Sequence, residues 1–270
     1  ATEDQVLTAA NTLADEDVLG TISYQWNRAG TAISSATSGT YTLTQSDVGS
    51  AITVTASYTD GQNTAESETS AATSAVANVN DDPTGSVTIS GTATEDQVLT
   101  AANTLADEDV LGSITYTWSN GDTGSTTTLG QSDVGNTITV TAAYTDGQGT
   151  AESETSAATG AVANVNDDPT GSVTISGTAT EDQVLTAANT LADEDGLGTI
   201  SYQWNRAGSA ISGATSSTYT LTQSDVGSAM TVTASYTDAQ GAAESSTSAA
   251  TGSVANVNDD ATASISGTAT

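Results

Sequence analysis

The stretch Ala51-Ile-Thr-Val-Thr-Ala-Ser-Tyr58 decides the fold class. From Ile52 to Tyr58 every even position carries an apolar side chain and every odd position carries Thr or Ser. Such a period of two places one face of an extended chain against a core and the other in water. Thr21–Trp26 and Ser86–Ser90 alternate in the same way, Gly and Asp clusters separate these runs, and no useful helix period occurs. The sequence therefore predicts an all-β protein.

The sequence also repeats itself. A string that begins Ala-Thr-Glu-Asp-Gln and ends Asp-Glu-Asp starts at Ala1, Ala93 and Ala179, so the copies are 92 and 86 residues apart. This period is too long for a solenoid and fits a small β-sandwich domain. We expect three tandem immunoglobulin-like or cadherin-like β-sandwich domains in a linear array. Their predicted ranges are 1–82 (without its first strand), 83–168 and 169–260, with 261–270 as the first strand of a following repeat or a donor strand.

One tryptophan per copy supports an immunoglobulin-like order of strands. Trp26, Trp118 and Trp204 each lie in the middle of an expected strand. An Asp-Val-Gly turn follows 21 residues later in the first and third copies and 15 residues later in the second, and leads into the next strand. A core this poor in large side chains needs its single Trp, so a carbohydrate-binding platform is the weaker interpretation. Asp47, in the first of these turns, is expected to accept backbone N–H groups as a turn cap.

Composition excludes several classes of function. The chain has no Cys and no His, its only cations are Arg28 and Arg206, and 33 acidic residues give a net charge of −31. Imidazole and thiolate catalysis, and the usual zinc sites, therefore have no residues to use. The negative charge repels nucleic acids and anionic membranes, and no apolar run is long enough to span a bilayer. We expect no enzyme activity, and carboxylates remain as the only charged chemistry.

The acidic residues gather at four places in each copy. These are the N-terminal Glu-Asp pair, the Asp-Glu-Asp loop, the acid of the last hairpin, and the Asn-Asp-Asp linker that ends the copy. In chain order the candidate metal ligands are Glu3, Asp15, Asp17, Asp60, Asn80, Asp81, Asp82, Glu95, Asp107, Asp109, Asp146, Asn166, Asp167, Asp168, Glu181, Asp193, Asp195, Asp238, Asn258, Asp259 and Asp260.

A sandwich topology brings these acids together at the joints between copies. The linker of one copy arrives beside the Asp-x-Asp loop and the hairpin acid of the next. Asp81 and Asp82 are thus expected to meet Asp107, Asp109 and Asp146, and Asp167 and Asp168 to meet Asp193, Asp195 and Asp238. So many carboxylates repel one another unless cations lie among them. Calcium, which takes six to eight oxygen ligands, is the cation that we expect.

The linker Asn-Val-Asn-Asp-Asp at Asn78 and Asn164, with the following Thr-Glu-Asp and Asp-x-Asp segments, resembles the cadherin-type repeats of large bacterial surface adhesins. The resemblance implies that the linker, the Asp-x-Asp loop and the hairpin Asp chelate calcium between domains. The sequence departs from that pattern, because the linkers open with Asn instead of an acid and no Asp-Arg-Glu motif occurs.

The two ends of the sequence leave two possibilities open. The first copy lacks the strand that Ser86–Ser90 supplies to the second, and the sequence ends with a strand-like stretch, Ala263–Thr270, that no further copy follows. The chain is either a segment of a longer array, or the final strand enters the first copy of another chain, head to tail, by donor-strand addition.

Three functions compete at this point. The leading hypothesis is a structural extender of a secreted cell-surface adhesin or extracellular filament, rigidified by calcium at the junctions. Adjacent repeats and calcium are then its partners, and it lies outside the cell. A glycan- or surface-binding module is the second hypothesis, and glycoside hydrolysis by paired carboxylates is a distant third, since nothing in the sequence indicates a cleft.

Overall fold

The computed structural model describes residues 1–258. The candidate ligands Asp259 and Asp260, and the predicted strand in 261–270, lie outside these residues. The described chain is all-β, as predicted. It contains nineteen strands and three short 3-10 helices, η1 (Gln45–Asp47), η2 (Gln131–Asp133) and η3 (Gln223–Asp225). None of these helices has the length or the apolar character needed to cross a membrane.

Two compact units make up the chain. One contains residues 1–92, 98–128 and 137–160, and the other contains residues 93–97, 129–136 and 161 onward. The division passes through the second sequence copy, so the three-domain division stays a prediction from the repeat.

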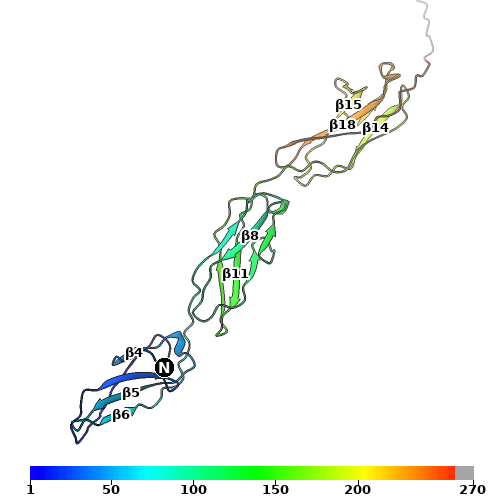
Figure 1. Ribbon diagram of the computed structural model, residues 1–270. Coiled ribbons are helices and arrows are strands. Elements are labelled where there is room, and N and C mark those ends of the chain that lie inside the picture. The colour runs from blue at the N-terminus through cyan, green and yellow to red at the C-terminus, as the bar shows by residue number, and fades with distance from the viewer. Residues whose placement is uncertain (259–270) are drawn as a thin grey trace, which may run out of the picture. The chain divides into compact units, whose positions relative to one another are not determined.

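Each copy contains two antiparallel sheets, and the number of strands in them differs from copy to copy (Figure 1). In the first copy, β1 (Val6–Thr8) pairs with β4 (Thr40–Thr42), while β3 (Thr31–Ala32), β2 (Ser23–Arg28), β5 (Ile52–Thr59) and β6 (Ala65–Thr69) form the second sheet in that order. In the second copy one sheet contains β10 (Thr126–Thr128), β8 (Val98–Asn103) and β7 (Val87–Ser90) in that order. The other sheet contains β12 (Ala151–Thr155), β11 (Val140–Thr145) and β9 (Thr115–Trp118).

The third copy has the fullest set of strands. One sheet contains β13 (Val173–Ser176), β14 (Val184–Asn189) and β17 (Thr218–Thr220), and the other contains β16 (Ser209–Ala210), β15 (Ser201–Arg206), β18 (Met230–Thr237) and β19 (Ala243–Thr247). All pairs are antiparallel. The predicted alternation is strict in β18, where Met230, Val232, Ala234 and Tyr236 are buried and the residues between them are not.

The tryptophan of each copy is buried between the two sheets. Trp204 is 0% exposed and packs in one apolar cluster with Leu185 from the facing sheet, while its ring stacks against Tyr219 at 5.8 Å between centroids. Trp26 has the same environment, with Tyr41 at 5.8 Å. Because the three Trp side chains fill the core, they form no aromatic platform for a sugar.

Both cations of the chain are used inside the copies. Arg206 Nε donates to Asp225 Oδ1 at 2.7 Å, and the other carboxylate oxygen of Asp225 accepts from the Thr222 backbone N–H and from the Tyr219 hydroxyl. Burial by itself would raise the pKa of Asp225, but these hydrogen bonds lower it overall. Arg28, Asp47, Tyr41 and Thr44 form the same network, and Asp47 caps η1 as expected.

We predict that Asp225→Ala lowers the free energy of unfolding of the third copy by about 2–3 kcal/mol. The loss is smaller than for a fully buried ion pair because the Arg206 side chain is one third exposed. The measurement is urea unfolding followed by the fluorescence of Trp204 in a background with Trp26→Phe and Trp118→Phe. Ser224→Ala, at the exposed neighbouring position, serves as the control and should unfold like the parent chain. Equal stability of Asp225→Ala and the parent would contradict the stabilising role of the network.

A candidate cation site at each junction between copies

The linker that follows the first copy is held by hydrogen bonds to buried carboxylates at both ends. Residues 1–3 run parallel to the start of this linker, through the bridge between Thr2 and Ala77. The Glu3 N–H donates to the Ala77 carbonyl at 3.0 Å, and Glu3 Oε2 accepts from the Val79 N–H at 3.4 Å. Two residues later, the Asp81 N–H donates to Asp109 Oδ2 at 3.1 Å. The linker thus passes directly from an acid of the first copy to an acid of the second.

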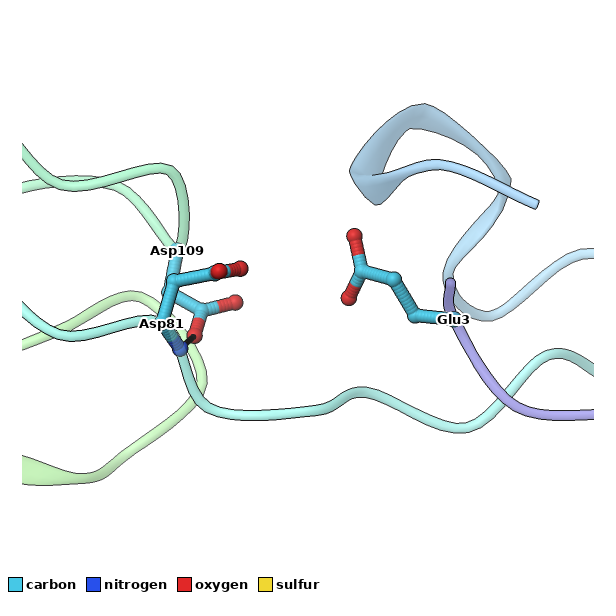
Figure 2. Close-up of side chains that lie close together, drawn as sticks. All are labelled: Glu3, Asp81 and Asp109. Carbon is cyan, nitrogen blue, oxygen red and sulfur yellow. Dashed lines mark hydrogen bonds between the residues drawn. The ribbon is translucent and has the colours of Figure 1, made fainter. Parts of the chain in front are cut away.

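This path brings three carboxylates together. Oxygen atoms of Glu3, Asp81 and Asp109 all lie within 4.8 Å of one another. Figure 2 shows Asp81 and Asp109 side by side, with the carboxylate of Glu3 directed toward them from the facing copy. Glu3 is 3% exposed and Asp109 is 0% exposed. Three negative charges therefore share a site that is largely removed from water.

The second linker repeats this arrangement. The Glu95 N–H donates to the Ala163 carbonyl, Glu95 Oε2 accepts from the Val165 N–H at 3.1 Å, and Asp195 Oδ2 accepts from the Asp167 N–H at 2.9 Å. Carboxylate oxygens of Glu95, Asp167 and Asp195 again lie within 4.8 Å of one another. The third copy shows the first half of the pattern, since Glu181 Oε2 accepts from the Val257 N–H at 3.1 Å.

The first acid of each Asp-x-Asp loop positions the loop. Asp107 Oδ1 accepts from the Asp109 N–H at 2.8 Å, and its other oxygen accepts from the Tyr144 hydroxyl. Asp193 has the same two kinds of partner, in Asp195 and Tyr236. Both oxygens of these residues are therefore occupied by protein groups, and the second Asp of the loop faces the linker.

The acid of each last hairpin also stabilises its own hairpin. Asp146 Oδ1 accepts from the backbone N–H groups of Gln148 and Thr150 at 2.8 Å each, which closes the hairpin. Burial by itself would raise the pKa of Asp146, but these bonds lower it overall. Gly147 next to it donates its N–H to the Asp109 carbonyl at 2.8 Å, so the hairpin lies against the Asp-x-Asp loop. Asp238 is bound to its own hairpin in the same manner.

The remaining predicted ligands lie elsewhere. Asp82 and Asp168 are exposed and belong to neither triad, although they were expected to join Asp81 and Asp167. Asn80 and Asn166 donate their side-chain amides to Glu152 and Glu244, at 2.8 and 2.9 Å, and so brace the linker against the next copy. Asn258 is exposed. Asp15, Asp17 and Asp60 form a third group within 4.8 Å, at the equivalent loops of the first copy.

Buried oxygen atoms without a hydrogen-bond partner are the most informative feature of the junctions. Within residues 1–258 they are side-chain oxygens in every case, and nitrogen atoms are absent from the set. They belong to Gln45, Asn78 and Asp146 around the first linker, and to Gln131, Asn164, Asp195 and Asp238 around the second. Burying a polar atom without a partner costs about 1–3 kcal/mol, more for a charged group. Both linkers therefore present acceptors that no protein donor satisfies.

Asp195 provides the sharpest case. It is 1% exposed, its Oδ2 accepts from the Asp167 N–H, and its Oδ1 has no hydrogen-bond partner. At the first linker the equivalent oxygen of Asp109 accepts from Gln45 Nε2 at 2.7 Å. Neither Gln45 nor Asn78 was among the residues predicted from the sequence. The recurrence of Gln-Ser-Asp at Gln45, Gln131 and Gln223, and of Asn at the start of each linker, was the available signal.

The electrostatic cost appears in the pKa values. Burial, followed by the charge of Asp109, raises the pKa of Asp81, and burial followed by the charge of Asp195 raises the pKa of Asp167. Burial also raises the pKa of Glu3, and the Val79 hydrogen bond offsets only part of the shift. In the absence of a cation, these groups therefore hold protons more tightly in the folded chain than in the unfolded one.

No family model and no curated protein matches the sequence. Among solved structures, the chain is similar to a tetra-tandem repeat in the extending region of a large adhesion protein, with 20% identity over 87% of this chain and 68% of that one and a TM-score of 0.27. It is also similar to a Ca2+-stabilised adhesin that helps an Antarctic bacterium to reach out and bind ice, with 16% identity, 96% and 69% coverage and a TM-score of 0.32.

A third similar structure is part of a 1.5-MDa bacterial ice-binding adhesin, with 15% identity, coverage of 90% of this chain and 89% of that one, and a TM-score of 0.31. At such scores the likeness carries no functional argument. The function must be inferred from the junction residues themselves.

We predict that without divalent cations the chain melts at a higher temperature as the pH falls from 7 toward the ordinary carboxyl range. A raised folded-state pKa contributes stability that is present at low pH and is lost as the pH rises through that pKa. Glu3, Asp81 and Asp167 act in this direction. Asp47 and Asp225 have lowered pKa values, so their contribution is lost only below the ordinary value of 3.8.

Calorimetry in EDTA at constant ionic strength measures this pH dependence. Asp81→Asn and Asp167→Asn together should flatten the rise, because they remove two of the titrating groups. A melting temperature that stays level or falls between pH 7 and pH 4 in the parent chain would contradict the electrostatic repulsion proposed for the junction carboxylates.

Proposed function

We propose that this chain is a structural extender of a secreted cell-surface adhesin or extracellular filament, in which calcium bound at the junctions holds each copy to the next. The observation that carries the proposal is the set of buried, unpartnered oxygens beside the two carboxylate triads. An acidic surface that served only solubility would leave its oxygens in water, where no partner is missing.

The donor set fits calcium better than other cations. The candidate ligands at the first junction are Glu3, Asp81 and Asp109. Gln45 donates its amide N–H to Asp109, Asn78 precedes the Val79 that donates to Glu3, and the side-chain oxygens of Gln45 and Asn78 are buried without a partner. Calcium takes oxygen ligands of this mixed kind, at flexible geometry, whereas zinc prefers nitrogen and sulfur, and magnesium keeps several waters. A bound calcium ion would supply two positive charges to a site that has three negative ones. Arg28 and Arg206 cannot do so, because each is paired with a buried Asp inside its own copy.

The position of the site favours a mechanical role. Glu3 belongs to the first copy and Asp109 to the second, and Asp81 lies in the linker between them. A cation that binds all three ties the linker to both copies and restricts its movement. A linker that becomes ordered only when it binds metal suits a protein that is exported without calcium and binds it outside the cell. Extracellular modules with calcium dissociation constants of about 0.1–1 mM are occupied there.

Asp109→Asn and Asp195→Asn are predicted to remove one calcium site each. In the parent chain, calcium at 100 times the dissociation constant should add about 2.7 kcal/mol of stability per site. Each variant should lose one site by isothermal titration calorimetry and part of the calcium-dependent rise in melting temperature. Glu108→Gln and Glu194→Gln, exposed acids in the same two loops, remove the same charge and are the matched controls.

Equal calcium stoichiometry in the Asp variants and the Glu controls would contradict the proposed sites. Small-angle scattering with calcium and with EDTA then tests the mechanical part of the proposal. Calcium should narrow the distribution of distances within the parent chain, and Asp109→Asn should reduce this effect. Binding without any change in scattering would leave calcium as a ligand and would contradict its role in stiffening the linkers.

A further inference from the structure

Two differences in sequence remove the arginine network from the second copy. Asn120 lies where the third copy has Arg206, and Thr127 lies where it has Tyr219. The second copy contains no Arg and no Lys, so the partners that the buried Asp133 has within this copy are neutral. A buried charge costs most free energy when no opposite charge is paired with it. The second copy therefore lacks an interaction that stabilises the third.

The sheet that contains the tryptophan is also smaller in the second copy. β9 ends at Trp118, whereas β15 continues past Trp204 to Arg206 and pairs there with β16. Among the described strands of the second copy none corresponds to β16, and Thr127 has no ring to stack on Trp118. The shorter loop of this copy offsets little of the loss, because the entropic cost of closing a loop rises only with the logarithm of its length.

The second copy also contributes a buried acid to each of the two triads. Asp109 belongs to the first triad and Glu95 to the second. Apart from the linker acids, the third copy contributes only Asp195 to the triads within residues 1–258. In the absence of a cation both triads oppose the folding of the second copy, because buried like charges repel one another. When both triads hold a cation, both stabilise it.

We propose that the second copy is less stable than the third when calcium is absent, and that calcium stabilises the second copy about twice as much. The calcium part of this inference rests on the proposed function, whereas the order of stability without calcium does not. A bound ion stabilises every copy whose unfolding destroys its site. Unfolding of the second copy destroys both triads, and unfolding of the third destroys one.

The two triads have the same types of residue at equivalent positions, so their contributions to the second copy are similar and add. The calcium concentration then determines how readily the middle of this segment opens. When calcium is scarce, the second copy opens while the third stays folded, and when calcium is abundant the second ion offsets the difference in stability.

Hydrogen exchange measured by mass spectrometry follows each copy separately in the unmodified chain. In EDTA the backbone amides of β11 should exchange faster than those of β18, because exchange of core amides reports the opening of the copy that contains them. Calcium at about 100 times the dissociation constant should slow exchange about 100-fold for each site that the opening destroys. The expected effect is therefore about 10,000-fold in β11 and about 100-fold in β18.

Asp195→Asn separates the two sites in the same measurement. This variant removes the second triad and leaves the first one intact. Calcium should then slow exchange about 100-fold in β11 and should have no effect in β18.

A matched pair of variants tests the assigned cause of the low stability. Asn120→Arg with Thr127→Tyr introduces the arginine network into the second copy and should slow the exchange of β11 in EDTA toward the rate of β18. Ser125→Arg with Thr127→Tyr adds the same charge and the same ring, but its arginine replaces an exposed residue of the neighbouring loop. This control should slow the exchange of β11 less.

Exchange of β11 in EDTA that is equal to that of β18, or slower, would overturn the inferred order of stability. Equal effects of calcium in the two strands would overturn the double dependence on calcium, and equal exchange in the two variants would overturn the role of the missing network. A chain in which calcium changes neither strand contradicts the proposed calcium sites themselves, and the comparison in EDTA is decided without them.

Discussion

The structure depends on how the linker backbone is held between two buried carboxylates. Val79 donates to Glu3 and Asp81 donates to Asp109, so a short extended segment is fixed at both ends. The same bonds draw Asp81 into a site where two buried acids already lie. Hydrogen bonds that organise the linker therefore also create the charge density that a cation would relieve. The same hydrogen bonds therefore order the linker and bring together the carboxylates that a cation would stabilise.

Different acidic residues of the chain have different structural roles. Asp47 and Asp225 are neutralised by the two arginines and serve the core of their own copies. Asp107 and Asp146 are largely satisfied by Tyr144 and by hairpin N–H groups, so they shape the loops around the linker. Asp109 is the one whose carboxylate faces the linker. A large negative charge is thus compatible with a stable fold, because most of the described acids are not buried and the buried ones accept hydrogen bonds from the protein.

The three copies also show how weakly a short sequence specifies a strand. Residues 6–11 and 98–103 are identical, yet only the second stretch is a full strand, because β7 supplies its hydrogen bonds and covers its apolar face. The alternation from Ile52 to Tyr58 gives the same lesson. Val54 and Tyr58 are partly buried, whereas their equivalents in β18, Val232 and Tyr236, are buried. The alternation of apolar residues determines which face of a strand can be buried. Whether that face is buried depends on the strand that packs beside it.

The sequence by itself determined the all-β class, the repeat, the tryptophan cores and the places where acids gather, since period-two patterning and turn residues act over a few positions. It did not determine which acids meet. Glu3 reaches Asp81 because residues 1–3 pair with a segment more than 70 residues away, whereas Asp82, the residue after Asp81, is exposed. Only the tertiary structure brings Gln45 to Asp109, because contacts between separate strands and loops leave no periodic trace in the sequence.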